Sequence, residues 1–275
     1  MEKTIGGLTP ETLEERRKGI GGSDVAAILG LSKFKTPLDV YHDKLFGTKT
    51  EMTQPMMAGI LLEDTIANWY MIESNRKVLR DNKIRYHKDI PYLLANIDRI
   101  ILPTNGEGRG ILEIKTAGLY AAKYWEDEPP MDYTLQLQHY LDVTGYTWGE
   151  FAVLVGGQDF RRYYVERDEE LIQLKNERLT NFWENHVLKA IPPDPINEKD
   201  LAQLYARHTE GKVIEAAEDT RNTIYDLKTL KEKIKQLEEE EAQLTERLKL
   251  ALGDAEALVY LGQPMVTWKT SKDSN

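Results

Sequence analysis

Apolar and polar residues follow one another along the first part of the chain in patterns that predict helices and then strands. Short apolar runs after glycine- and proline-containing turns predict two short helices, over residues 25–30 and 37–47. Ser23 precedes the first of them and is expected to cap its N-terminus. Apolar residues recur at helical spacing over 55–74, which predicts a longer helix.

Extended runs come next. The first three, at 77–86, 92–102 and 110–116, are expected to form a meander in which turn-rich residues 103–108 join the last two. Further along, the same patterns predict two helices, two strands and a long amphipathic helix, at 119–126, 133–144, 151–155, 160–165 and 168–190. The order α, β, β, β, α, β indicates an α/β (α+β) fold.

The character of the chain changes after the proline-rich segment 191–195, which is its clearest boundary. Beyond this segment, apolar residues alternate three and four positions apart over about 220–252, with a break at Glu241. The apolar positions are Leu227, Leu230, Ile234, Leu237, Leu244 and Leu248. This heptad pattern is typical of a coiled coil, and a helical hairpin is the alternative.

A small terminal hairpin is predicted from extended residues 257–260 and 266–269 on either side of a glycine- and proline-containing turn. The chain is therefore expected to have a core over 1–190. Residues 191–275 are expected to form an appendage that serves assembly or partner binding.

The composition narrows the chemistry that the chain can carry out. Its 275 residues include no cysteine, which excludes disulfide frameworks, thiolate zinc sites, iron–sulfur clusters and cysteine nucleophiles. Any metal is therefore held by oxygen atoms or by the five histidines. The formal net charge of -10 argues against a uniformly basic DNA-binding surface, so a nucleic-acid role depends on local basic patches.

Membrane association is not expected. No uninterrupted apolar run approaches the roughly 20 residues that span a bilayer. The first residues lack the basic-then-apolar pattern of a signal peptide, so we expect a cytoplasmic location.

The most informative chemistry lies in the predicted strands. Fourteen residues separate Asp98 from Glu113, and the two-residue period of a strand places Glu113 and Lys115 on one face. If Asp98 points to that face, two carboxylates and the carbonyl of Ile114 can bind a hard cation such as Mg²⁺. Lys115 would then orient the attacking water and stabilise developing charge. The alternative is an exposed strand face that carries an ordinary Glu–Lys pair.

Glu63 lies within the apolar stripe of the helix predicted over 55–74. Burying an uncompensated carboxylate costs several kcal/mol, so Glu63 is expected to be paired, hydrogen-bonded or linked to a metal. A helix packed on the meander would bring it to Asp98 and Glu113. The alternative is a residue at the helix edge that reaches solvent.

Two further pairs of polar residues are candidates for phosphate or water contacts. Gln136 and Tyr140 are one helical turn apart and share a face, although such residues are commonly half-buried packing residues. Arg16 and Ser23 flank a glycine-rich loop that enters a helix, and a guanidinium with a hydroxyl at a helix N-terminus can bind a phosphate. The alternative is an ordinary capping loop whose glycines serve only the turn.

Taken in this order, the motifs resemble those of the phage-type alkaline exonucleases, the lambda exonuclease and YqaJ-like viral recombinase group of the PD-(D/E)XK nuclease superfamily. The resemblance spans about residues 14–190. The usual Pro before the motif Asp is replaced by Ile97. The residues that carry the resemblance are Arg16 to Ser23 with Gly19-Ile20-Gly21-Gly22 between them, Gly59-Ile60-Leu61-Leu62-Glu63, Asn96-Ile97-Asp98-Arg99, Glu113-Ile114-Lys115 and Gln136-Leu137-Gln138-His139-Tyr140.

The resemblance implies a nuclease core with a central mixed sheet flanked by helices, followed by a helical, coiled-coil appendage. It implies that Asp98, Glu113 and the Ile114 backbone carbonyl hold Mg²⁺, for which Mn²⁺ can substitute. Glu63 completes the metal site, directly or through a water, and Lys115 assists the attacking water.

The same resemblance adds Gln136 and Tyr140 to the catalytic residues and assigns the 5′-terminal phosphate of DNA to Arg16 and Ser23. It implies a Mg²⁺-dependent 5′-to-3′ double-strand DNA exonuclease of a phage or prophage recombination system. Such an enzyme leaves 3′ single strands for a strand-annealing protein. The implied partners are double-stranded DNA ends, that annealing protein and further copies of the chain, since some members of the family form rings.

Two other functions are open on the sequence alone. One is an endonuclease of the PD-(D/E)XK superfamily, of restriction or repair type, which would also cut closed circular DNA. The other is a non-catalytic DNA-end-binding scaffold whose main functional surface is the heptad segment.

Overall fold

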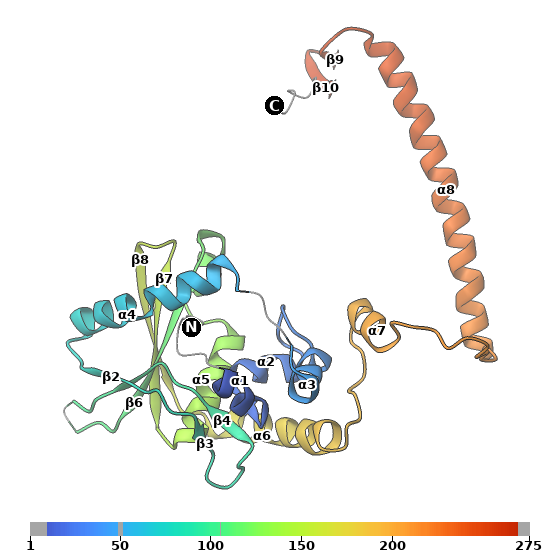
Figure 1. Cartoon of the computed structure of the whole chain (residues 1–275). Helices are drawn as coiled ribbons and strands as arrows, with labels where there is room; N and C mark the ends of the chain where they lie inside the picture. Colours follow the sequence, from blue (N-terminus) through green and yellow to red (C-terminus); the bar gives the residue numbers. More distant parts are fainter. Residues whose placement is uncertain (1–9, 49–51, 105, 269–275) are drawn as a thin grey trace. The chain divides into compact units, whose positions relative to one another are not determined.

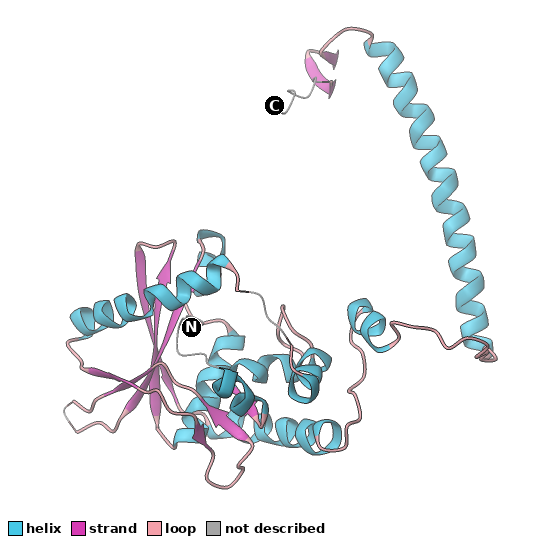
Figure 2. Cartoon of the chain, viewed as in Figure 1, coloured by secondary structure: helices cyan, strands magenta, loops and turns pink. Residues whose placement is uncertain are grey.

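A computed structural model describes residues 10–48, 52–104 and 106–268. The chain divides into two compact units, Met1–Ala206 and Arg207–Asn275. The first unit combines helices with strands, and the second consists of a long helix and a small hairpin (Figures 1 and 2). None of the helices in the described ranges is long and apolar enough to cross a membrane.

The first unit contains two sheets and the helices around them. Its helical segments are α1 (Pro10–Arg17), α2 (Gly22–Ile28), α3 (Pro37–Phe46), α4 (Gln54–Ser74), the 3-10 helix η1 (Leu119–Trp125), α5 (Met131–Thr144), α6 (Glu169–Phe182), the π-helix η2 (Trp183–Val187) and α7 (Glu198–Leu204). Its strands are β1 (Ile20–Gly21), β2 (Val78–Arg80), β3 (Arg85–Tyr86), β4 (Leu93–Ala95), β5 (Arg99–Ile101), β6 (Gly110–Ala117), β7 (Trp148–Val155) and β8 (Asp159–Glu166).

The larger sheet has the strand order β2-β5-β6-β7-β8. Its neighbouring strands are antiparallel except for β6 and β7, which are parallel over Ile111–Ala117 and Gly149–Val155. Parallel neighbours need a crossover connection, and η1 and α5 provide it. The expected central mixed sheet flanked by helices is therefore confirmed.

The two faces of this sheet bury two hydrophobic clusters. Leu112 and Ile114 of β6 pack with Ile66 and Tyr70 of α4 on one face. The neighbouring position Ile111 belongs to the other cluster, which contains residues of α2, α5 and α6. In Figure 1, α4 crosses the strands of this sheet, and α5 lies beside them. The alternation of β6 side chains between these helices places Glu113 and Lys115 on the α5 face.

The expected meander is wrong in one respect, because each of its first two extended runs is broken. Residues 77–86 contain β2 and β3, and residues 92–102 contain β4 and β5. β3 and β4 leave the larger sheet and form a second sheet with β1, in the order β1-β4-β3. The chain crosses from one sheet to the other just before Arg99, so Asp98 lies at a strand break rather than inside a strand.

The cap of the first short helix also differs from the prediction. Helix α2 begins at Gly22, and its N-cap is Gly21. The predicted N-cap, Ser23, lies two residues further along the chain. The carboxylate of Asp24 accepts a hydrogen bond from the Gly21 backbone N–H at 3.0 Å, so this N–H group has a partner at the helix start. Ser23 therefore lies within the first helical turn.

The predicted long helix over 168–190 ends earlier than expected. Asp168 caps α6 by accepting from the Leu171 N–H, and after Phe182 the chain continues through η2. Helix α7 follows the proline-rich segment and remains attached to the first unit. Its Asp200 is fully buried and accepts a hydrogen bond from the Thr36 hydroxyl at 2.8 Å.

The second unit contains α8 (Glu218–Leu252), which Gly253 ends, and the antiparallel strands β9 (Ala257–Tyr260) and β10 (Gln263–Thr267). The heptad segment is thus one continuous helix, and the alternative of a helical hairpin is wrong. The terminal hairpin is confirmed, with its second strand beginning three residues earlier than predicted. Position 269, the predicted end of that strand, lies outside the described residues.

Candidate active site

Asp98 and Ile114 meet where pairing between β5 and β6 stops. The last paired residues are Arg99 and Leu112. Immediately before β5, the Asp98 carboxylate accepts a hydrogen bond from the Ile114 backbone N–H at 2.8 Å. The N–H and C=O groups of one strand residue point to the same side, so the Ile114 carbonyl is directed to this open edge as well.

Glu113 is the centre of a hydrogen-bonded cluster between β6 and α5. This residue is only 2% exposed, and its Oε1 atom accepts from Lys115 Nζ at 2.8 Å and from Gln136 Nε2 at 2.7 Å. Lys115 Nζ also donates to Gln136 Oε1 at 3.0 Å, and Gln136 Nε2 approaches the Tyr140 hydroxyl at 3.0 Å. Four predicted site residues are therefore in direct contact.

The charges in this cluster perturb one another. Burial, followed by the charge of Glu113, raises the pKa of Asp98 well above its ordinary value. Burial also raises the pKa of Glu113, although Lys115 acts in the opposite direction. Burial disfavours the charged form of Lys115, but the carboxylates of Glu113 and Asp98 outweigh this effect and raise the pKa of its ammonium. The cluster therefore has more negative charge than its single ammonium compensates.

The two oxygens of the Glu113 carboxylate differ in their surroundings. No described residue donates a hydrogen bond to Glu113 Oε2, although this atom is buried. A buried carboxylate oxygen without a partner is costly, and a cation bound there would satisfy it and relieve the repulsion between Asp98 and Glu113. Carboxylate and carbonyl oxygens are the ligands that Mg²⁺ prefers. The residues present fit a divalent cation.

The cation would rest on two carboxylates and a backbone oxygen rather than on a third acidic side chain. Among the described residues, no three His, Asp or Glu side chains are grouped closely enough to hold a metal ion. Glu63 lies instead against Arg99, whose Nη1 donates to Glu63 Oε1 at 2.5 Å and to the Asp98 carbonyl at 2.6 Å. Arg99 thus links Glu63 to Asp98.

This contact explains how the structure accommodates Glu63. Arg99 is the register partner of Leu112, so its side chain projects on the α4 face of the sheet, where it is only 4% exposed. Its second Nη atom bonds Asp64 at 2.5 Å. Of the three expectations for Glu63, the structure realises the ion pair and the hydrogen bond, both with Arg99. No hydrogen bond joins the Glu63 carboxylate to Asp98 or Glu113 among the described residues.

Arg16 and Ser23 come together at the start of α2. Arg16 Nη2 lies 3.5 Å from the Ser23 hydroxyl, across the glycine-rich loop. Lys44 of α3 fixes this loop, because its Nζ donates to the Asp24 carboxylate at 2.6 Å and to the Arg16 carbonyl at 3.2 Å. A guanidinium, a hydroxyl and a helix start therefore lie side by side.

The loop is also in contact with the acidic cluster. An added Cβ at Gly22 would lie 2.4 Å from the Tyr140 ring and 2.9 Å from Gln136 Cγ, so only glycine fits against α5 here. Burial, then the charge of Glu113, raises the pKa of Tyr140, while Arg16 acts in the opposite direction. The two groups of predicted site residues therefore border one another.

Three residues of the site were not predicted from the sequence. Arg99 bridges Glu63 and Asp98, and Lys44 secures the Arg16 loop through Asp24. No spacing rule reports these contacts, because each depends on how separate helices and strands pack. Glu63 was the one available signal, because a carboxylate within an apolar stripe is expected to have a partner, and Arg99 is that partner.

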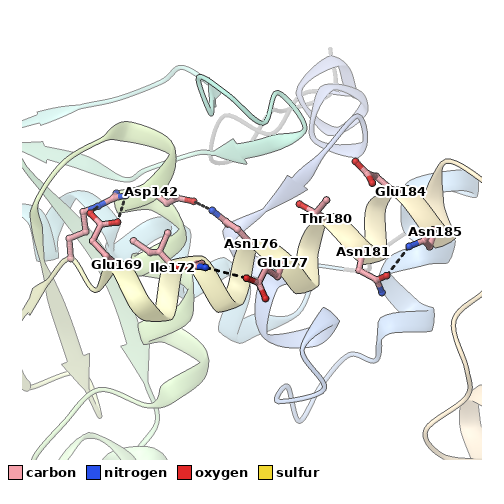
Figure 3. A pocket seen from close by; sticks show the side chains of 11 residues that line it. Asp142, Glu169, Ile172, Asn176, Glu177, Thr180, Asn181, Glu184 and Asn185 are labelled. Carbon is pink, nitrogen blue, oxygen red and sulfur yellow. Dashed lines mark hydrogen bonds and ion pairs between the residues drawn. The ribbon is translucent and has the colours of Figure 1, made fainter.

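A separate groove runs along α6 and reaches Asp142 of α5, with a volume of about 770 Å³ (Figure 3). Its lining includes the polar side chains of Asn176 and Glu177 and the apolar Ile172 of α6, together with Asp142 of α5. Asp142 accepts hydrogen bonds from Asn176 and from the buried Lys175. None of the predicted site residues lines this groove.

Comparison with solved structures places this fold among nucleases. The chain is similar to the crystal structure of an alkaline exonuclease (LHK-Exo) from Laribacter hongkongensis, with a TM-score of 0.54 and 21% sequence identity. The match covers 72% of this chain and 98% of that one. The structure of LHK-Exo in complex with dAMP matches to the same extent. The mixed sheet with its helices is thus the fold of an alkaline exonuclease.

The family follows from sequence comparison. Residues 11–147 match the model of the YqaJ-like viral recombinase domain. The protein YqaJ of Bacillus subtilis (strain 168) is 39% identical over 268 residues, which cover 94% of this chain and 82% of YqaJ. The chain therefore belongs to the YqaJ-like viral recombinase family, as its motifs indicated.

Replacing Asp98 with Asn should stabilise the metal-free protein at alkaline pH. The folded-state pKa of Asp98 lies above the unfolded value of about 3.9, so ionisation of Asp98 costs stability. The cost is absent below the unfolded pKa and grows as pH rises through the folded pKa. Asparagine keeps an acceptor for the Ile114 N–H but has no charge.

Urea unfolding in EDTA, followed by tryptophan fluorescence, measures this effect. We expect Asp98→Asn to have the higher free energy of unfolding at about pH 8 and the difference to close near pH 4. The exposed Asp194→Asn serves as the matched control. A difference between wild type and Asp98→Asn that does not change with pH would contradict the account.

Proposed function

We propose that this protein is a Mg²⁺-dependent exonuclease that degrades one strand of double-stranded DNA in the 5′-to-3′ direction. The observation that carries the proposal is the cluster of Asp98, Glu113 and Lys115, in which no described residue donates a hydrogen bond to Glu113 Oε2. Membership of the YqaJ-like family and the alkaline exonuclease fold support the same reaction class.

Each residue of the cluster has a distinct task in this proposal. Asp98, Glu113 and the Ile114 carbonyl hold the cation, which when bound supplies Lewis-acid polarisation of the scissile phosphate. Lys115 remains protonated, because its pKa is raised, and presents its positive charge to the phosphate and the attacking water. Gln136 fixes the positions of Glu113 and Lys115 through its amide.

The remaining site residues orient the cluster and the DNA. Tyr140 supports Gln136 at 3.0 Å, and Glu63 positions Asp98 through the bridging Arg99. Arg16 and Ser23 bind the 5′-terminal phosphate at the start of α2, which sets the direction of digestion. Glu63 is thus a positioning residue in this proposal.

The biological setting follows from the family. A viral recombinase domain suits a phage or prophage recombination system, in which the 3′ single strands pass to an annealing protein in the host cytoplasm. The net charge of -10 repels DNA at long range, so binding depends on a locally basic channel and weakens strongly with added salt. Mn²⁺ is expected to replace Mg²⁺, because both accept oxygen ligands.

Loss of Lys115 should abolish cleavage. In Lys115→Ala, we expect the rate of digestion of linear duplex DNA with Mg²⁺ to fall at least about a hundredfold, because the charge that stabilises the transition state is lost. DNA binding, measured by fluorescence anisotropy, should be largely retained. The surface residue Lys199 provides the control Lys199→Ala, which should cleave like wild type.

The same assay separates the alternatives when it includes a closed circular duplex and EDTA. An intact circle beside a digested linear DNA, with no digestion in EDTA, is the expected result. Cutting of the circle would favour the endonuclease of restriction or repair type. Cleavage of no substrate would favour the DNA-end-binding scaffold, and near-normal cleavage by Lys115→Ala would contradict the catalytic assignment.

Arg16 should determine the preference for a 5′-phosphorylated end. Wild type is expected to digest linear DNA faster from a 5′-phosphate than from a 5′-hydroxyl. In Arg16→Ala, the two rates should become equal, because the guanidinium that pairs with the phosphate is lost. Arg17→Ala is the matched control, since Arg17 lies against Gly47 instead. An unchanged preference in Arg16→Ala would exclude this phosphate site.

A further inference from the structure

Helix α8 exposes an apolar seam that is interrupted at Glu241. Only Leu252, at its last position, is buried. The six apolar heptad residues are all between 45% and 56% exposed: Leu227, Leu230, Ile234, Leu237, Leu244 and Leu248. In the described part of the second unit, residues 207–268, no other segment covers this seam. A seam of this kind is normally stable only when a second helix packs on it.

We propose that α8 pairs with α8 of a second copy of this chain in an antiparallel coiled coil. The heptad places Leu227, Ile234, Glu241 and Leu248 at the a positions. Thr223, Leu230, Leu237 and Leu244 are the d positions that alternate with them. In an antiparallel pair, each a residue faces a d residue of the other copy.

The seam residues match in this orientation. When Ile234 faces Leu237 of the second copy, Leu227 faces Leu244, and the reciprocal contacts repeat these layers. Glu241 then faces Leu230 and lies next to Lys231 of the second copy, which can neutralise it. The two Glu241 residues are about 16 Å apart along the pair, at 1.5 Å for each residue between them.

The flanking charges carry the argument for self-pairing. In this register, the g positions bring Asp226 opposite Arg247 and Lys233 opposite Glu240 of the second copy. The e positions bring Lys231 opposite Glu238. Every charged flanking residue from Asp226 to Arg247 thus meets the opposite sign, and each contact occurs twice by symmetry.

A parallel pair fits less well. It also pairs Asp226 with Lys231 and Lys233 with Glu238, but it leaves Glu240 and Arg247 opposite Thr245 and Leu252. It also places Glu241 directly against Glu241 of the second copy in the apolar seam. Two like charges in one layer destabilise a pair. The antiparallel arrangement therefore pairs more of the flanking charges of α8 and keeps the two Glu241 residues apart.

Exchanging charges tests the orientation. In the full chain, Arg247→Glu should weaken dimerisation, measured by sedimentation, roughly tenfold, because Glu would face Asp226 at both symmetric contacts. The double variant Asp226→Arg with Arg247→Glu should restore it. In a parallel pair, Arg247→Glu changes no charge contact and Asp226→Arg opposes Lys231. Lys235→Glu, which makes the same charge change at an outward b position, is the matched control.

Cross-linking gives a second readout that does not depend on affinity. The chain has no cysteine, so each introduced thiol is the only one present. When tagged Leu227→Cys is mixed with untagged Leu244→Cys under oxidising conditions, the antiparallel pair predicts the mixed cross-link. A parallel pair predicts only links between identical variants. Lys235→Cys should form neither, and circular dichroism checks that each variant keeps its helix.

Three results would overturn the proposal. A chain that stays monomeric at every concentration would show that α8 packs within its own chain or binds a different protein. Cross-links only between identical variants would show a parallel pair. A dimerisation constant that is unchanged in Arg247→Glu would place the contact between copies in the first unit. None of these outcomes bears on the exonuclease proposal, which rests on other residues.

Discussion

A carboxylate buried at position 113 requires partners, because an uncompensated charge in a protein interior costs several kcal/mol. Lys115 and Gln136 are those partners, one from the same strand and the other from a separate helix. Lys115 follows two residues later on the same strand, whereas Gln136 lies on α5, the crossover between the parallel strands β6 and β7. The mixed sheet is therefore what brings this site together.

A second constraint is the early end of the β5–β6 pairing. Because pairing stops at Arg99 and Leu112, the Ile114 N–H is free to bind the Asp98 side chain, and a second carboxylate approaches the first. Arg99 anchors the same turn from the opposite face through Glu63. The surrounding hydrogen bonds thus keep the carboxylates of Asp98 and Glu113 close together despite their repulsion, as a cation-binding site requires.

Much of this could be predicted from the sequence, because it depends on local periodicity. The two-residue period of a strand placed Glu113 and Lys115 together, and the helical turn between Gln136 and Tyr140 placed both on one face. The breaks in the extended runs were missed, although Asp81, Asn82, Asn96 and Asp98 are residue types that strands disfavour. The division of the flanking segments between two sheets depends on tertiary packing. Arg99 and Lys44 depend on tertiary packing alone.

Diffraction from crystals grown with Mn²⁺ tests the central claim most directly, since anomalous scattering locates the ion independently of any activity. The account predicts one strong anomalous peak between the carboxylates of Asp98 and Glu113, within coordination distance of the Ile114 carbonyl, and no peak there in Glu113→Gln. An ordered Asp98–Glu113 cluster without a Mn²⁺ peak would contradict the claim that these residues form the metal site.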